Sequence, residues 1–352
     1  MNRPIKVVIV DDSELIRVLL AEIFSSDPAI HVVGMATDAF DAREKIKELN
    51  PDVITLDVEM PGMDGITFLK NIMRLRPMPV VMISTLTEKN TATTLQAMEL
   101  GAIDFIAKPK MDVQAELPVL ARHICTTVKN AAKANISALN HNSQQRQFSK
   151  IIVPAASSKP NNRISIIAIG ASTGGTEATK EVLSCLPENM PPIVVVQHMP
   201  ESFTASYATR LNSLTELTVE ELSKLSTPLQ NNHVYIANGA SHMLVRRRND
   251  KAIALRSDEQ PVNRHKPSVD VLFNSIAENY GSDAISIILT GMGIDGVSGM
   301  AKMKNAGAET IAQDEKSSVV WGMPRVASER GAANKIMPLS EIGQFLVNKC
   351  YT

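Results

Sequence analysis

The stretch Ile164-Ser-Ile-Ile-Ala-Ile-Gly-Ala-Ser-Thr-Gly-Gly175 decides the fold of the second half of this chain. Its apolar run, bounded by glycines, is typical of a parallel strand that is buried on both faces. Residues 176–186 follow with the apolar spacing of a helix. The pattern therefore predicts a strand that turns tightly into a helix, with Ser172 at the carboxyl end of the strand.

The small residues around Ser172 leave three interpretations open. The segment fits the G-x-S-x-G elbow, which exposes a serine hydroxyl and leaves backbone N–H groups for an oxyanion. It also resembles a glycine loop that cradles a phosphate or a dinucleotide, and it can be a structural turn. Other parts of the chain must decide between them.

The composition limits the possible classes of protein. At 352 residues the chain exceeds one typical domain, so we expect two. Lys and Arg number 36 against 37 Asp and Glu, a balance that does not favour nucleic acid binding. Three widely spaced cysteines, without metal-ligand spacing, indicate a reducing cytoplasm. The first apolar run is too short for a signal peptide or a membrane span, so we expect a soluble cytoplasmic protein.

Five strands alternate with helical patterns up to residue 125, at 5–10, 31–35, 53–56, 80–83 and 103–107. This alternation predicts a doubly wound parallel sheet of the flavodoxin-like type. Polar side chains follow four of these strands: Asp11 and Asp12, then Asp57, Ser84 and Lys108. The carboxyl ends of parallel strands share one edge, so we expect these groups to converge.

Helix capping explains Asp11, Asp12 and Ser13 but not Asp57 and Lys108. Hard carboxylates suit a metal ion, and a lysine suits phosphoryl oxygens, as a Mg²⁺-assisted phosphoryl acceptor requires.

Residues 126–163 lose the apolar periodicity and read as a polar linker. Strands at 164–169, 193–196 and 284–289 then predict a second, Rossmann-like doubly wound domain, with helices at 268–280 and 297–305 among others. The β-rich middle, at 234–236, 243–245 and 252–255, looks like an antiparallel insertion. We interpret Arg246-Arg-Arg248 as the solvated end of a hairpin. The expected domains are 1–125 and 164–352, joined by the linker 126–163.

In this second domain Ser172, His198 and Asp295 each follow a predicted strand. A dinucleotide site would place an acid where the chain has His198. The three residues instead suit a nucleophile, a general base and a carboxylate that orients the base. Backbone N–H groups of Thr173 and Met292 are candidate oxyanion donors. The order Ser, His, Asp differs from that of α/β-hydrolases, and Asp295 can also cap the next helix.

The first domain resembles a two-component receiver domain on the strand-end residues quoted above. The resemblance implies phosphorylation at Asp57 and contacts of Ser84 and Lys108 with the phosphoryl group. It also implies that Mg²⁺ is held by Asp57, Asp12, Asp11 through water, and the backbone carbonyl of Glu59. A cis peptide at Lys108-Pro109 and a switching aromatic at Phe105 are further implications, with a plain core role as the alternative for Phe105.

The whole chain resembles the chemotaxis protein-glutamate methylesterase family. The resemblance rests on the receiver and on five blocks: Gly170-Ala-Ser-Thr-Gly-Gly175, Gln197-His-Met-Pro200, Leu289-Thr-Gly-Met-Gly-Ile-Asp-Gly296, Thr310-Ile-Ala-Gln-Asp314 and Gly322-Met-Pro324. The linker is longer and richer in Asn and Gln than the family leads us to expect.

This family resemblance implies hydrolysis of glutamyl methyl esters on chemoreceptor helices to glutamate and methanol, and deamidation of receptor glutamines. It implies a histidine kinase as phosphodonor, a location peripheral to receptor arrays, no cofactor for the hydrolysis, and a receiver that inhibits the esterase until Asp57 is phosphorylated. The rival hypothesis is a receiver with a non-catalytic binding or scaffold domain. The chain shows no helix-turn-helix pattern with clustered Lys and Arg, which argues against DNA binding.

Overall fold

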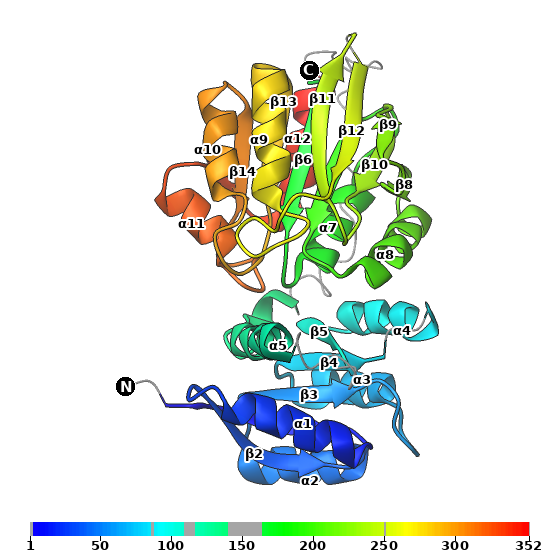
Figure 1. Cartoon of the computed structure of the whole chain (residues 1–352), viewed down its shortest axis with the longest axis vertical. Coiled ribbons are helices and arrows are strands. Elements are labelled where there is room, and N and C mark those ends of the chain that lie inside the picture. Colours follow the sequence, from blue (N-terminus) through cyan, green and yellow to red (C-terminus); the bar gives the residue numbers. More distant parts are fainter. Residues whose placement is uncertain (1–2, 86–87, 109–116, 140–163, 250, 352) are drawn as a thin grey trace. The chain divides into compact units, whose positions relative to one another are not determined.

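The computed structural model describes residues 3–85, 88–108, 117–139, 164–249 and 251–351 (Figure 1). The chain divides into two compact units between Leu139 and Asn140, and each unit has its own parallel sheet. None of the helices within these ranges is long and apolar enough to cross a membrane. The boundaries 1–125, 126–163 and 164–352 stay predictions.

The first unit is a five-stranded parallel sheet in the order β2-β1-β3-β4-β5. Its strands are β1 (Ile5–Val10), β2 (Ile30–Ala36), β3 (Val53–Asp57), β4 (Val80–Ser84) and β5 (Asp104–Ala107). Its helices are α1 (Glu14–Ser25), α2 (Ala39–Leu49), α3 (Gly65–Leu75), α4 (Glu88–Glu99) and α5 (Leu117–Ala131). The predicted doubly wound sheet is confirmed. The strand order reverses between β1 and β3, and a ligand site is expected at their carboxyl ends.

The second unit contains a seven-stranded parallel sheet in the order β15-β14-β13-β6-β7-β10-β8. Its strands are β6 (Ile166–Ala171), β7 (Ile193–Gln197), β8 (Thr218–Glu221), β10 (His233–Ile236), β13 (Ala284–Ile288), β14 (Glu309–Gln313) and β15 (Lys335–Met337). Its helices are α7 (Gly175–Ser184), α8 (Glu201–Leu214), α9 (Val269–Tyr280), η1 (Gly281–Asp283), α10 (Val297–Asn305), α11 (Met323–Glu329) and α12 (Leu339–Tyr351). The quoted stretch 164–175 supplies the central strand β6, which lies between β13 and β7 and is buried along its whole length.

A three-stranded antiparallel sheet, β11-β12-β9, is the predicted insertion. It consists of β9 (Ser226–Pro228), β11 (His242–Arg248) and β12 (Lys251–Ser257). The prediction that residues 234–236 belong to this insertion is wrong, because β10 pairs in parallel with β7 and β8 in the main sheet. Three consecutive residues of β10 are fully buried, as in a strand covered on both faces rather than in a half-exposed hairpin. The three arginines at 246–248 are exposed near the hairpin end, as predicted.

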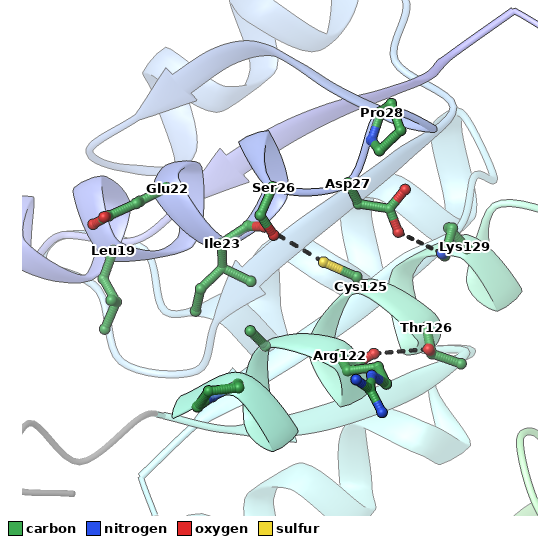
Figure 2. A pocket seen from close by; sticks show the side chains of 12 residues that line it. Leu19, Glu22, Ile23, Ser26, Asp27, Pro28, Arg122, Cys125, Thr126 and Lys129 are labelled. Atoms are coloured by element: carbon green, nitrogen blue, oxygen red, sulfur yellow. Dashed lines mark hydrogen bonds and ion pairs between the residues drawn. The ribbon is translucent and has the colours of Figure 1, made fainter. Parts of the chain in front are cut away.

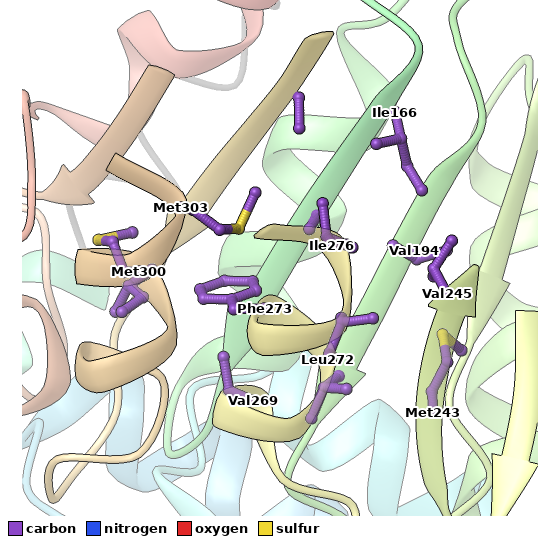
Figure 3. Packing of buried hydrophobic residues seen from close by; sticks show 14 of the residues in the cluster. Ile166, Val194, Met243, Val245, Val269, Leu272, Phe273, Ile276, Met300 and Met303 are labelled. Atoms are coloured by element: carbon purple, nitrogen blue, oxygen red, sulfur yellow. The ribbon is translucent and has the colours of Figure 1, made fainter. Parts of the chain in front are cut away.

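Helix α9 packs between α10 and the antiparallel sheet on one face of β6 (Figure 3). Leu272, Phe273 and Ile276 of α9 are fully buried in this cluster. The approach of α9 to β6 depends on Gly170, because a Cβ atom there would lie 2.3 Å from Cγ1 of Val269. Gly170 therefore fixes the N-terminus of α9 over the carboxyl end of β6.

We predict that Gly170→Ala lowers the free energy of unfolding of the second unit by about 1–3 kcal/mol, because the added methyl group overpacks the contact between α9 and β6. The single tryptophan, Trp321, lies in this unit, so its fluorescence in thermal and urea unfolding of the full chain reports on it.

The control is a double-mutant cycle with Val269→Ala, which removes the methyl groups that the new Cβ atom would meet. Gly170→Ala should cost less in the Val269→Ala background than in the wild type. Equal losses of unfolding free energy in both backgrounds would show that the contact with Val269 is not the cause of the destabilisation.

Candidate active site

Ser172 and His198 lie side by side, just beyond the carboxyl ends of two neighbouring strands of the second sheet. In the pairing of β6 with β7, Ala171 lies opposite Gln197, so Ser172 and His198 are the next residues on each strand. The His198 N–H donates to the carbonyl of Ala171 at 3.0 Å, which extends the pairing to this point. Adjacent strands are about 4.8 Å apart, so the two side chains start from neighbouring positions.

The turn after β6 is held by hydrogen bonds to the carbonyl of Ser172. The N–H of Gly175 donates to it at 2.7 Å, and Nε2 of Gln197 donates to it at 2.9 Å. Gly174 has a φ of 76°, which glycine adopts without steric cost. Ser172 is half-buried and lies just before α7, at the turn from strand to helix that the sequence predicts.

His198 and Asp295 form a direct pair, with 2.8 Å between Nε2 and Oδ2. The side chain of His198 is 8% exposed and that of Asp295 is fully buried. A carboxylate only accepts hydrogen bonds, so Nε2 carries the ring proton and Nδ1 of the neutral imidazole is an acceptor. Nδ1 of His198 is buried, and within the described residues it has no hydrogen-bond partner. This nitrogen can accept a proton.

The carboxylate of Asp295 is surrounded by donors. Ser268 Oγ donates to Oδ1 at 2.7 Å and Asn263 Nδ2 at 2.8 Å, while the N–H of Val269 donates to Oδ2 at 2.7 Å. Burial raises the pKa of Asp295, but the hydrogen bonds from His198, Asn263 and Ser268 outweigh burial and hold this pKa below its usual range. Asp295 is therefore ionised at neutral pH.

The alternative in which Asp295 caps the following helix is wrong, because the N-cap of α10 is Gly296. The carboxylate lies instead at the N-terminus of α9, where free N–H groups and the helix dipole favour an anion. Asn263 also donates to a second buried carboxylate, that of Asp270, at 2.7 Å. One asparagine side chain thus joins both acids to the loop before α9.

The predicted oxyanion donors lie on two loops near Ser172. Thr173 is buried, and Met292 is 37% exposed in the loop after β13. That loop approaches Ser172 closely at Gly291, where a Cβ atom would lie 2.7 Å from Cβ of Ser172. No hydrogen bond from the Met292 N–H is found within the described part of the chain. The donor roles of Thr173 and Met292 stay predictions.

Several residues that support the site were assigned no role from the sequence. Thr290 Oγ1 donates to the carbonyl of Thr173 at 3.0 Å, and the Thr290 N–H donates to Oε1 of Gln313 at 2.7 Å. Gln197, Thr290 and Gln313 lie at or just beyond the carboxyl ends of strands. Because these ends share one edge of the sheet, their position could have predicted a place near the site. Asn263 carries no such signal, because it lies in a loop 32 residues before the carboxylate that it contacts.

The first unit gathers the predicted charged groups at the carboxyl ends of β1 and β3. Carboxylate oxygens of Asp11, Asp12 and Asp57 lie within 4.8 Å of one another. Nζ of Lys108 is 2.8 Å from Oδ2 of Asp57 and 3.0 Å from Oδ2 of Asp11. Asp11 and Asp57 are buried, whereas Asp12 is exposed.

This carboxylate cluster fits a divalent cation. Burial raises the pKa of Asp57 to about 6, and the charge of Asp11 adds to this effect while Lys108 opposes it. A hard cation with oxygen ligands would offset that unfavourable concentration of negative charge. The backbone of Glu59 donates a hydrogen bond to the Asp57 carboxylate. The role of the Glu59 carbonyl as a ligand stays a prediction.

Ser84 and Phe105 are both buried, Ser84 at the end of β4 and Phe105 on β5. Oγ of Ser84 donates to the carbonyl of Thr85 at 3.2 Å. The burial of Phe105 accords with a core residue, and a switching role stays a prediction. The predicted cis peptide involves Pro109, which lies outside the described residues.

A groove of about 720 Å³ also lies between α1 and α5 of the first unit (Figure 2). An ion pair of 2.5 Å between Lys129 and Asp27 lies at this groove, and Cys125 Sγ donates to the carbonyl of Ile23 at 3.5 Å. None of Asp11, Asp12 and Asp57 lines it. The groove is therefore distinct from the carboxylate cluster.

Comparison with known proteins gives consistent results for both units. Residues 167–346 match the family model described as CheB methylesterase, and residues 7–117 match the response regulator receiver domain. A protein-glutamate methylesterase/protein-glutamine glutaminase of Xanthomonas campestris pv. campestris is 50% identical over 99% of this chain and 98% of its own length. One of Hydrogenovibrio crunogenus is 48% identical over 96% of both chains.

A crystal structure of the Thermotoga maritima CheB methylesterase catalytic domain is 40% identical, with a TM-score of 0.51, and covers 53% of this chain and 98% of its own. The matches span both units and nearly the full length of the curated relatives. The chain therefore belongs to the CheB methylesterase family and carries the response regulator receiver domain of that family.

Proposed function

We propose that this protein hydrolyses glutamyl methyl esters of chemoreceptor proteins to glutamate and methanol, and deamidates specific receptor glutamines. The observation that carries the proposal is the buried pair of His198 and Asp295, with Nδ1 of His198 left as an acceptor beside the strand that ends just before Ser172. Membership of the CheB methylesterase family gives independent support. We place the reaction in the cytoplasm, at receptor arrays and outside the membrane.

Ser172, His198 and Asp295 have separate roles in the proposed reaction. Oγ of Ser172 attacks the side-chain carbonyl carbon while Nδ1 of His198 takes the serine proton. The imidazolium then protonates the leaving group, which departs as methanol from an ester or as ammonia from an amide. A water molecule, deprotonated by His198, hydrolyses the acyl-serine. Asp295 remains ionised throughout and stabilises the imidazolium, in accord with its lowered pKa.

Backbone N–H groups of Thr173 and Met292 would stabilise the oxyanion of the tetrahedral intermediate. This proposal is supported by the close approach of Gly291 to Ser172, which brings the Met292 loop to the nucleophile. Both donors are fixed backbone groups, and such groups stabilise developing charge without reorganising during the reaction. No group in this mechanism requires a cofactor.

In the receiver we propose that Asp57 accepts a phosphoryl group from a chemotaxis histidine kinase. Asp11, Asp12, Asp57 and the Glu59 carbonyl would hold Mg²⁺, which neutralises charge on the transferred group when it is bound. Lys108, already 2.8 Å from Asp57, and Ser84 would contact the phosphoryl oxygens.

We further propose that the unphosphorylated receiver inhibits the esterase and that phosphorylation relieves the inhibition. The alternative is a non-catalytic second unit that only binds a partner. A binding unit gives no reason for a buried carboxylate, held by four other donors, to hold the ring of His198. Labelling of Ser172 by a fluorophosphonate distinguishes an esterase from a binding unit, since the labelling requires an activated serine.

We predict that Ser172→Ala lowers methanol release from methyl-esterified receptor membranes at least about 1,000-fold and abolishes fluorophosphonate labelling, because the nucleophile is lost. His198→Ala should be nearly as severe, and Asp295→Asn somewhat less. Ser213→Ala, at an exposed position on α8, is the matched control and should be neutral. Near wild-type hydrolysis by Ser172→Ala would refute the assignment of the nucleophile.

We predict that acetyl phosphate with Mg²⁺ labels the wild-type chain but not Asp57→Asn, because the acceptor carboxylate is removed. Intact-mass measurement and acid-labile radiolabel both report the modification. Asp52→Asn is the control, since Asp52 lies just before the other end of β3. Label that persists in Asp57→Asn would move the acceptor elsewhere, with Asp12 as the first residue to test.

We predict that a fragment beginning near residue 151 hydrolyses receptor esters about 5- to 150-fold faster than the unphosphorylated full-length chain, the range typical of coupling between sites. Acetyl phosphate should accelerate the full-length chain and leave the fragment unchanged. A fragment slower than the resting chain would contradict inhibition and indicate a receiver that activates by contact or by recruitment.

A further inference from the structure

His265 lies against the catalytic imidazole. The rings of His265 and His198 are stacked, with 3.7 Å between their centroids and 6° between their planes. His265 is half-buried and lies 67 positions after His198, in the loop that precedes α9. His265 does not follow a strand, so its sequence position did not indicate a place in the site. The reaction proposed above gives His265 no role.

The loop that carries His265 is fixed on both sides of the ring. Val262 and His265 exchange two backbone hydrogen bonds, of 3.1 and 2.9 Å. Asn263, between them, has a φ of 51° and reaches the carboxylate of Asp295. Further along, the Ser268 N–H donates to Nδ1 of the buried His242 at 3.1 Å. These backbone hydrogen bonds close the turn that presents the imidazole of His265 to His198.

We propose that His265 is a positioning residue for the catalytic base, and this inference rests on the proposed function. The hydrogen bond of His198 to Asp295 fixes one point of the ring but leaves rotation about that bond. A flat ring stacked on one face of His198 opposes this rotation and keeps Nδ1 directed at the nucleophile. Proton abstraction depends strongly on this direction, so the stack should act on kcat.

The stacked ring has a second effect when His198 becomes an imidazolium during the reaction. The face of an aromatic ring attracts a cation held within about 6 Å of its centroid, and more strongly where water is excluded. Both effects require an aromatic plane at position 265 and do not require its ring nitrogens. A side chain of similar bulk without a π-face should not replace it.

The test compares His265→Phe with His265→Leu in the full-length chain, with acetyl phosphate and Mg²⁺ present, on methyl-esterified receptor membranes. We expect His265→Leu to lower kcat about 10-fold with KM changed by less than about twofold. His265→Phe should stay within about threefold of the wild type. His123→Leu, an exposed histidine on α5, is the control and should be neutral.

Two outcomes would overturn the proposal. Wild-type kcat in His265→Leu would show that the stack does not matter, and equal losses in the Phe and Leu variants would show that the aromatic face is not the cause. Far-UV circular dichroism and Trp321 fluorescence establish folding. If His265→Leu does not fold, His265→Gln replaces it, and the same two outcomes decide.

Two further measurements separate this proposal from the proposed function. The rate of fluorophosphonate labelling of Ser172 should fall about 10-fold in His265→Leu, and it needs no receptor. The proton of the His198 N–H···Asp295 bond, observed by NMR with Asp295→Asn to assign it, should shift or broaden in His265→Leu but not in His265→Phe. If the wild type releases no methanol and these two differences remain, the proposed substrate fails and the role of His265 stands.

Discussion

The second unit depends on one buried charge, the carboxylate of Asp295. It is fully buried, and an isolated carboxylate in that position would be protonated or would unfold its surroundings. Four kinds of group keep it ionised: the imidazole of His198, the hydroxyl of Ser268, the amide of Asn263 and the first N–H groups of α9. One arrangement thus includes the packing of α9 on Gly170, the loop before α9 and the orientation of His198. A change in any of these three alters the other two.

Most of the fold could be predicted from the sequence because both sheets are parallel and buried. Continuous apolar runs mark such strands, and their carboxyl ends share an edge, which brought Asp11, Asp57, His198 and Asp295 to the right places. The same reasoning failed at residues 234–236, because a short apolar run does not reveal which strand it pairs with. It also missed Asn263 and His265, whose contacts arise from a loop path that no periodicity encodes.

The two units use carboxylates in opposite ways. In the receiver, burial and a neighbouring acid raise the pKa of Asp57 to about 6, so its ionised form is poorly stabilised without further positive charge. In the second unit, donors from a helix N-terminus and a loop lower the pKa of Asp295. The proposed cation or acyl phosphate would therefore remove an unfavourable charge from the first arrangement. The second is insensitive to such changes.

This contrast bears on how phosphorylation can control hydrolysis. A carboxylate with a strongly lowered pKa and a full set of donors does not change its charge near neutral pH, so Asp295 has little capacity to be tuned electrostatically. Control of hydrolysis by phosphorylation is then more effective if it changes which molecules reach Ser172 than if it changes the charge of Asp295. On this view, activated and resting protein differ in their rate with a protein substrate and much less in the intrinsic reactivity of Ser172 toward a small reagent.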